Sequence, residues 1–130
     1  MASNNIKKTR GDFGEVAVRD YLTKRGYKIV TNNYRKRDGE IDIVVVQNDE
    51  VIFVEVKTRK FGSLTEGIDA VTLDKRRKII KTARAFLSDN PQYNSMNTRF
   101  DVAQVVITTD DIPRLLEIDY YEDAFNPIFL

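Results

Sequence analysis

Two residue types that carry much of enzyme chemistry are missing, because the 130-residue chain contains neither cysteine nor histidine. Without cysteine, the chain cannot form disulfides, thiolate nucleophiles or cysteine-based zinc sites. Without histidine, no imidazole can act as a general base or bind a metal ion. Any metal ion must therefore be held by oxygen ligands, and any general base must be a carboxylate, a lysine, a tyrosine or water.

Long apolar runs are also missing. No run approaches the roughly 18 residues that span a bilayer, and residues 1–8 lack the apolar core of a signal peptide. Hydrophobic residues make up 42% of the chain and charged residues 32%, which is typical of soluble globular proteins. We therefore expect one cytoplasmic domain over residues 1–130, with residues 1–8 disordered and no membrane contact.

The charges are segregated along the chain, although the net charge is only +1. Residues 1–37 carry ten bases against three acids, and residues 57–87 carry nine bases against three acids. Between them, residues 38–56 carry six acids and no base. Basic walls around an acidic floor would suit a polyanion that is cleaved with the help of a metal ion. Ordinary surface charge on helices would give the same distribution.

Residues 39–58 have the pattern of a β-hairpin, with two β-branched runs on either side of a polar tip. If the loop is symmetric, Val46 pairs with Val51, Asp42 lies opposite Glu55, and Glu40 lies opposite Lys57. Facing carboxylates destabilise a sheet, and a bound divalent cation would remove that conflict. A one-residue asymmetry of the loop, or solvation of both acids at a sheet edge, would also remove it.

The order Asp42, then Glu55-Val56-Lys57, matches the requirements of metal-dependent phosphodiester hydrolysis. Asp42 and Glu55 would bind Mg²⁺ or Mn²⁺, with the backbone carbonyl of Val56 as a further oxygen ligand. Such an ion polarises a phosphodiester and lowers the pKa of a bound water. Lys57 would orient the attacking water or stabilise charge in the transition state. An ion pair between Lys57 and Glu40 is the other interpretation.

Glu15 lies in a segment predicted to be a helix from Thr9, as N-cap, to about Arg25, with Gly26 ending it. Gly14 inside this helix predicts the close approach of a neighbouring backbone. Two apolar stripes suggest cover on two sides, the core stripe being Phe13, Val16, Ala17 and Tyr21 and the second Val18 and Leu22. Glu15 would then be partly buried and could bind a second ion or the attacking water. It could equally be an exposed acid favoured by the helix dipole.

The remaining segments complete an α-β-β-β-α-β-β order. The pattern predicts strands at residues 27–31, 99–108 and 114–120, and a helix over residues 73–87 with Thr72 as its N-cap. Its apolar stripe comprises Leu73, Ile79, Ile80, Ala83, Phe86 and Leu87. Hairpins combined with a helical crossover predict an α/β fold with a mixed sheet.

Basic residues cluster in two predicted loops, residues 32–39 and 58–63, and on the second helix. They are candidate nucleic-acid contacts: Arg35, Lys36, Arg37, Arg59, Lys60, Lys75, Arg76 and Lys78. A basic helix is otherwise a solvated surface.

Four sequence strings carry a resemblance to a known family. They are Gly14-Glu15, residues 39–44 (Gly-Glu-Ile-Asp-Ile-Val), residues 53–59 (Phe-Val-Glu-Val-Lys-Thr-Arg) and residues 99–102 (Arg-Phe-Asp-Val). These strings resemble the YraN-type family of small bacterial proteins. That family is similar to archaeal Holliday-junction resolvases of the restriction-endonuclease-like superfamily, and the resemblance runs from Gly11 to Phe125.

The resemblance implies an α-β-β-β-α-β nuclease core with its site at the hairpin. It carries the nuclease roles to Glu15, Asp42, Glu55 and Lys57. Ile41 stands where the superfamily pattern has a proline, at a position that supplies no ligand.

The resulting hypothesis is a Mg²⁺- or Mn²⁺-dependent endonuclease that hydrolyses phosphodiester bonds in DNA, with branched DNA as one substrate. Junction cleavage requires two active sites, so a homodimer would be consistent with it. Two other functions stay open, a non-catalytic nucleic-acid-binding module on the same fold and a protein-interaction domain.

Overall fold

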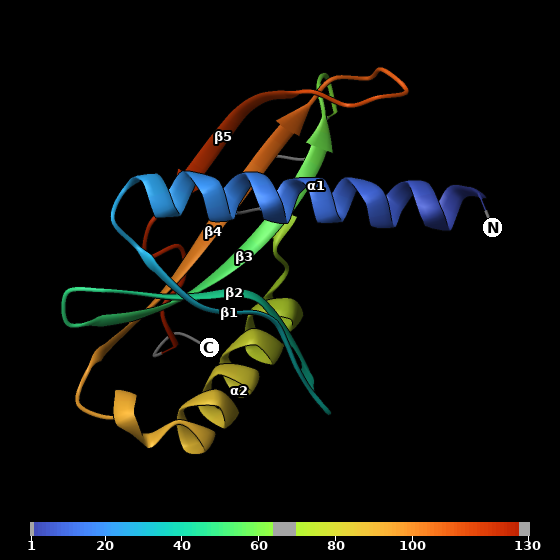
Figure 1. The fold of residues 1–130 in the computed structure, drawn as a ribbon. Helices are drawn as coiled ribbons and strands as arrows, with labels where there is room; N and C mark the ends of the chain where they lie inside the picture. The colour runs from blue at the N-terminus through green and yellow to red at the C-terminus, as the bar shows by residue number, and fades with distance from the viewer. Residues whose placement is uncertain (1, 64–69, 128–130) are drawn as a thin grey trace.

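The computed structural model describes residues 2–63 and 70–127, with side chains of the first helix described from Asp12 onward. Figure 1 shows the order of the elements, which confirms the predicted α-β-β-β-α-β-β sequence. They are α1 (Ala2–Lys24), β1 (Lys28–Lys36), β2 (Gly39–Gln47), β3 (Glu50–Lys60), α2 (Leu73–Asp89), the short 3₁₀ helix η2 (Pro91–Tyr93), β4 (Asn97–Ile107) and β5 (Leu115–Tyr121).

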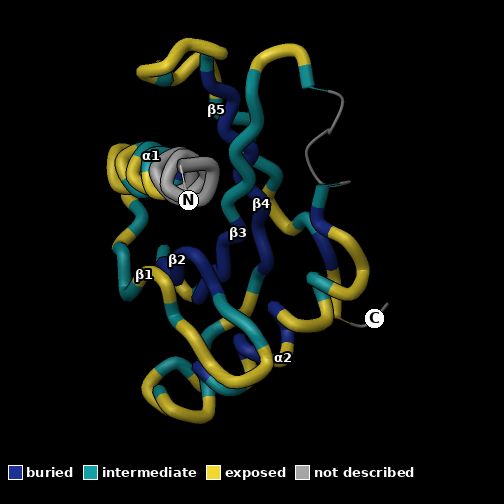
Figure 2. The backbone as a smooth tube through the Cα atoms, turned by 90° about the vertical axis from the view of Figure 1, so that its right-hand side faces the viewer, coloured by how far each residue is buried: buried dark blue, intermediate teal, exposed yellow. Residues whose placement is uncertain are grey.

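The five strands form one mixed sheet in the order β1-β2-β3-β4-β5. β3 and β4 are parallel, and the other neighbours are antiparallel. A parallel pair needs a crossover connection, and the β3–β4 connection contains α2. Figure 2 shows α1 and α2 on opposite sides of the sheet. The predicted α/β fold with a mixed sheet is therefore confirmed.

A separate hydrophobic core lies on each face of the sheet. On the α2 side, Phe53 and Phe100 stack at 5.5 Å and pack with Phe86 of the helix. On the α1 side, Val18 and Leu22 pack with buried residues of β2, β3 and β4. Both faces of β3 are covered, which explains why residues 51–54 form an uninterrupted apolar run.

α1 begins earlier than its sequence suggested. The helix starts at Ala2, so the N-cap predicted at Thr9 is wrong. Residues 2–10 contain neither proline nor glycine, and nothing in that stretch prevents a helix. Of the eight residues for which disorder was predicted, Met1 lies outside the described residues and the other seven belong to α1. The C-terminal prediction is confirmed, because Gly26 follows the helix with φ +87°.

The buried face of α1 differs in part from the prediction, although Phe13 and Tyr21 of the predicted stripe pack against the core. Val18 and Leu22 are fully buried, whereas Val16 of the predicted core stripe is 55% exposed. Gly14 lies directly against β3, where an added Cβ would collide with Thr58 Oγ1. The close approach predicted at Gly14 is therefore to a side chain of β3 and not to a backbone.

β1 is a longer strand than predicted and continues through most of the expected basic loop. Only Arg37 and Asp38 connect it to β2, so the loop prediction for residues 32–39 is wrong. Within β1, Asn33 adopts the left-handed conformation with φ +54°. The neighbouring pairs on either side place Asn33 opposite Asp42 of β2.

The β2–β3 hairpin has the predicted register, with Val46 paired to Val51. Regular pairing ends at Ile43 and Val54, beyond which β2 stays with β1 while β3 follows β4 to Lys60. Figure 1 shows the two strands separating in this direction. We call the place where they separate the fork. Because the strands part there, the predicted pairing of Glu40 with Lys57 does not form.

α2 begins after Thr72, whose hydroxyl accepts a hydrogen bond from the Lys75 backbone N–H at 3.2 Å, as the cap prediction required. Ile79, Ile80, Ala83 and Phe86 are buried as predicted, but Leu73 is 54% exposed. None of the described helices is long and apolar enough to cross a bilayer.

Candidate active site

The fork brings two acidic side chains together inside the protein. Asp42 of β2 is 7% exposed and Glu55 of β3 is 4% exposed. Burial, followed by the negative charge of Asp42, raises the pKa of Glu55 from 4.5 to about 8. Two facing acids that cannot both ionise easily are the arrangement that the hairpin register predicted.

A backbone hydrogen bond fixes the orientation of Asp42. The Val56 N–H, which lies beyond the end of the β2–β3 ladder, donates to Asp42 Oδ2 at 2.7 Å. Burial raises the pKa of Asp42, and this hydrogen bond acts in the opposite direction by favouring the carboxylate. Asp42 therefore substitutes for a missing strand partner and is held in one position.

Two lysines face Glu55 from different elements. Lys57 Nζ lies 3.8 Å from Glu55 Oε1, and Lys75 Nζ, from the first turn of α2, lies 3.9 Å from the same oxygen. Glu40 pairs with Arg35 at 3.0 Å, so the ion pair considered between Glu40 and Lys57 does not form. Lys75 was predicted only as a nucleic-acid contact, because the sequence does not show where α2 packs.

The second oxygen of Glu55 has a different environment. Oε2 is buried and has no hydrogen-bond partner among the described residues. The carboxyl groups of Glu55 and Asp42 are close enough for a protonated Glu55 to share its proton with Asp42. When both acids are ionised, the buried oxygen is costly unless a cation binds it.

The charge of Asp42 acts on Glu15 of α1. Glu15, Asp42 and Glu55 are nevertheless not placed to hold one metal ion together. Burial, followed by the charge of Asp42, raises the pKa of Glu15. With its amide oriented so that the nitrogen faces the acid, Asn33 donates to both Glu15 oxygens, at 3.1 and 3.3 Å. Asn33 was not predicted as a site residue, and its left-handed conformation within β1 is not indicated by any periodic pattern of the sequence.

The donor set fits a hard cation that is held mainly by two carboxylates. In the described part of the chain, no three acidic side chains are placed to hold one ion together. Mg²⁺ commonly binds one or two carboxylates and fills its other positions with water and substrate phosphates. Asp42 and the unpartnered oxygen of Glu55 meet that requirement. The Val56 carbonyl as a further ligand, and Glu15 as a ligand of a second ion, stay predictions.

Comparison with known proteins identifies the family. Residues 14–105 match the group described as "Uncharacterised protein family UPF0102". The chain belongs to the UPF0102 family. This is the YraN-type family that the sequence motifs resembled.

Two UPF0102 proteins illustrate the similarity. The protein of Treponema pallidum (strain Nichols) is 41% identical over 122 residues, which are 93% of this chain and 95% of that protein. The protein of Synechococcus sp. (strain JA-3-3Ab) is 44% identical over 119 residues, 89% of each chain. The family match at residues 14–105 contains all four predicted catalytic residues, Glu15, Asp42, Glu55 and Lys57.

The Arg-Phe-Asp-Val string of this UPF0102 chain has a structural role. Asp101 is completely buried and accepts two hydrogen bonds from Arg99, each 2.9 Å, and one from Tyr120 OH at 2.6 Å. The backbone N–H of Asp123 donates a fourth hydrogen bond to Asp101, at 2.9 Å. Because its charge is fully paired, Asp101 ties β4 to β5 and is not available for chemistry.

Contacts within the protein hold several of the basic residues that were predicted to bind nucleic acid. Several are held by acids at the surface: Arg35 by Glu40, Lys36 by Asp89 at 2.8 Å, and Lys78 by Asp74 at 3.1 Å. Arg59 lies further along β3, where its Nη1 donates to the Ser63 carbonyl at 3.5 Å. Arg76 donates to the Val71 carbonyl at 2.8 Å beside the start of α2.

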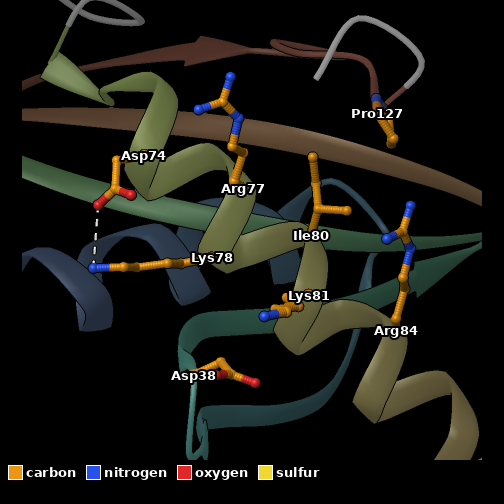
Figure 3. Close-up of a pocket in the computed structure, with 8 residues that line it drawn as sticks. All are labelled: Asp38, Asp74, Arg77, Lys78, Ile80, Lys81, Arg84 and Pro127. Carbon is orange, nitrogen blue, oxygen red and sulfur yellow. Dashed lines mark ion pairs between the residues drawn. The ribbon is translucent and has the colours of Figure 1, made fainter.

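A basic groove of about 480 Å³ runs along the outer side of α2. Figure 3 shows its lining, including the ion pair between Asp74 and Lys78. The groove is lined by Asp38, Asp74, Arg77, Lys78, Ile80, Lys81, Arg84 and Pro127. Of these, sequence reasoning named only Lys78 as a contact.

Proposed function

We propose that this UPF0102 protein is a metal-dependent phosphodiesterase that cleaves nucleic acid, with DNA as its substrate. One observation carries the proposal. Two buried carboxylates, Asp42 and Glu55, meet where two strands separate, one of their oxygens is unpartnered, and two lysines face them. Buried acids with raised pKa values beside specific charges are typical of functional sites.

The two acids would hold Mg²⁺ or Mn²⁺. When bound, such an ion polarises the phosphodiester and lowers the pKa of a bound water. The raised pKa of Glu55 means that the site without a cation tends to retain a proton, which Glu55 must release before both acids can bind as carboxylates. The Val56 N–H keeps Asp42 oriented for binding.

Lys57 would stabilise the negative charge that develops on the phosphoryl oxygens during cleavage. Its Nζ lies 3.8 Å from Glu55 Oε1, so the protein holds the ammonium group of Lys57 beside the two acids before substrate binds. A preorganised cation of this kind lowers the barrier because little rearrangement is needed in the transition state. Lys75 would contribute in the same way from α2.

Glu15 would accept the proton of the attacking water. Its pKa is raised, which makes its carboxylate a stronger base, and Asn33 holds it in position. Glu15 stands apart from the Asp42–Glu55 pair, which is consistent with a role toward water and not toward the same ion.

The choice of DNA, including branched DNA, is supported by the resemblance of the sequence motifs to junction resolvases and by the basic surfaces around the fork. Cleavage of a junction by this chain would need two copies of the site.

The test is cleavage of branched, single-stranded and duplex DNA with Mg²⁺ or Mn²⁺. We expect Asp42→Asn, Glu55→Gln and Lys57→Met each to lower the rate by roughly 10²-fold or more, the scale seen when an electrostatic stabiliser is removed. Glu117→Gln, an exposed acid on β5, is the control and should leave the rate unchanged.

Two results would contradict the proposal: cleavage by the Asp42 and Glu55 variants at the wild-type rate, or no cleavage by the wild type. DNA binding that is insensitive to EDTA, without cleavage, would instead identify a non-catalytic binding module. One observation favours this second function: among the described residues, only two acids converge at the fork.

A further inference from the structure

A second cavity lies next to the candidate active site and shares Lys57 with it. It has a volume of about 430 Å³ and is lined by residues 57–60, Ser63, Ala70 and Gln104. Gln104 enters from β4, where the parallel register pairs it with Lys57. The cavity therefore lies beyond Lys57 in the direction in which β3 leaves the fork.

The described residues that line this cavity are basic or uncharged. Lys57, Arg59 and Lys60 contribute three positive charges, and no acid is among the described residues of the lining. The groove on α2 differs, since Asp38 and Asp74 are part of its lining and Asp74 pairs with Lys78. The described residues of the cavity beside the site therefore attract an anion more strongly than those of the groove on α2.

Among the residues that line the cavity, three side-chain donors are buried and have no hydrogen-bond partner among the described residues. They are Thr58 Oγ1, which lies against Gly14 of α1, and Arg59 Nε and Ser63 Oγ. The guanidinium is held from one side, where Arg59 Nη1 donates to the Ser63 carbonyl across a long 3.5 Å. Buried polar groups are nearly always paired, so donors left without partners beside a cavity indicate a ligand. A planar guanidinium with an unused edge suits the oxygens of a phosphate.

The position of the cavity along the strand identifies which phosphate it would bind. Glu55, Lys57 and Arg59 are two residues apart and point to one side of β3, at steps of roughly 6.5 Å. A nucleic-acid strand that follows β3 would meet the carboxylate pair first, then Lys57, then Arg59. We propose that the cavity binds the backbone phosphate next to the one that is cleaved, with Arg59 and Ser63 as its donors. This inference rests on the proposed function for the nature of the substrate.

Binding is measured in EDTA, where no cleavage occurs, so the subsite is tested separately from catalysis. Fluorescence anisotropy of a labelled DNA oligonucleotide is recorded over a series of salt concentrations for the wild type, Arg59→Met, Arg59→Lys and Ser63→Ala. We expect Arg59→Met to bind about tenfold more weakly and to lower the salt dependence by about one phosphate contact. Arg59→Lys should retain part of the affinity, and Ser63→Ala should lose a few-fold.

Lys28→Met is the matched control, because it also removes one positive charge, from an exposed residue at the start of β1. It should bind DNA within about twofold of the wild type, as expected when only long-range attraction is lost. Thermal melting verifies that each variant is folded. If Arg59→Met is not, Arg59→Lys and Ser63→Ala decide the question.

Steady-state cleavage gives an independent readout. Arg59→Met should raise KM while leaving kcat at saturating DNA near the wild-type value, because Arg59 contacts a phosphate that does not react. Loss of affinity in Arg59→Met would support the subsite even if the wild type cleaves nothing, in which case only the proposed function fails. Wild-type affinity and salt dependence in both Arg59→Met and Ser63→Ala would overturn the subsite, whether or not the protein cleaves DNA.

Discussion

At the scale of single residues, the hydrogen bonding of the buried acids distinguishes an acid with a structural role from a candidate catalytic acid. Asp101 is fully buried, and four hydrogen bonds from three residues satisfy its charge. Glu55 is almost as buried, yet one of its oxygens has no partner among the described residues and its pKa rises to about 8. Glu55 therefore depends on a proton shared with Asp42, or on a bound cation, where Asp101 depends on neither, and buried acids with raised pKa values are frequent at functional sites.

The pH dependence of stability in EDTA follows from Glu55. Its pKa is raised from 4.5 to about 8 in the folded protein, so the folded state retains a proton that the unfolded chain loses. The contribution is fully present below pH 4.5 and is lost as the pH rises toward 8. We expect the free energy of unfolding of the wild type to fall over this interval by a few kcal/mol at most, at about 1.4 kcal/mol per pKa unit.

Glu55→Gln should remove most of this pH dependence and exceed the wild type in stability at pH 8. Urea unfolding at several pH values measures both proteins, with Glu117→Gln as the exposed control. A Glu55→Gln profile that runs parallel to that of the wild type would show that Glu55 does not titrate in this range. Asp42, Lys57 and Lys75 face Glu55, and Asp42→Asn should flatten part of the profile because its charge raises the pKa of Glu55.

The sequence predicted those site residues whose positions depend on nearby residues, and it did not predict those whose positions depend on the packing of distant segments. Asp42 and Glu55 meet because of a hairpin register that depends on only a few residues of the turn, and the sequence contains that information. Lys75 reaches the site through the packing of α2, and Asn33 reaches Glu15 from β1, where it adopts the left-handed conformation. Neither is encoded by a periodic pattern, so sequence reasoning placed one of them in another role and missed the other.

At the scale of elements, the contact of α1 with β3 positions Glu15. Gly14 lets the helix lie on the strand, because a larger residue would meet Thr58 Oγ1. Of the predicted core stripe, Phe13 and Tyr21 pack against the core, and the prediction was wrong for Val16. A helix that contacts a sheet through a glycine buries residues around that glycine, and hydrophobicity alone gave equal weight to Val16 on the other side.

Gly14→Ala tests this contact. Alanine normally stabilises a helix interior by about 1 kcal/mol over glycine, but here we expect a net loss of about 1–3 kcal/mol from overpacking. The double variant Gly14→Ala/Thr58→Ala removes the colliding oxygen and should recover most of the loss, as measured by urea unfolding. Equal destabilisation with and without the Thr58 change would place the origin of the effect elsewhere.

At the scale of the whole molecule, the order of elements and the sheet class were predictable because the hydrophobic pattern changes period at nearly every boundary. The ends of α1 and β1 were not, since polar residues are compatible with a helix, a strand or a loop. Residues 32–36 are a case in point, because they look like a loop by composition but extend β1 through pairing with β2. The neighbouring strand decided their conformation.

Cation binding by the folded protein should stabilise the entire domain. Because the acids meet only when β2 and β3 are folded together, a cation that binds there favours the native state. At Mn²⁺ concentrations about 100-fold above its Kd, the gain would be about 2.7 kcal/mol and would raise the Tm in differential scanning fluorimetry. Asp42→Asn should show no such gain, whereas Glu117→Gln should match the wild type. An equal shift of Tm in all three proteins would locate cation binding outside the fork.

The fork also couples a backbone amide to a side chain. The Val56 N–H donates to Asp42 Oδ2 and not to a carbonyl of β2. The protection of this amide against exchange with deuterated solvent therefore depends on the charge and position of one carboxylate, while its neighbours in the β2–β3 ladder depend on the sheet. Protonation of Asp42, or the binding of a cation to it, would change the Val56 amide resonance more than the other amide resonances of β3. This one backbone proton therefore reports the state of the acid pair.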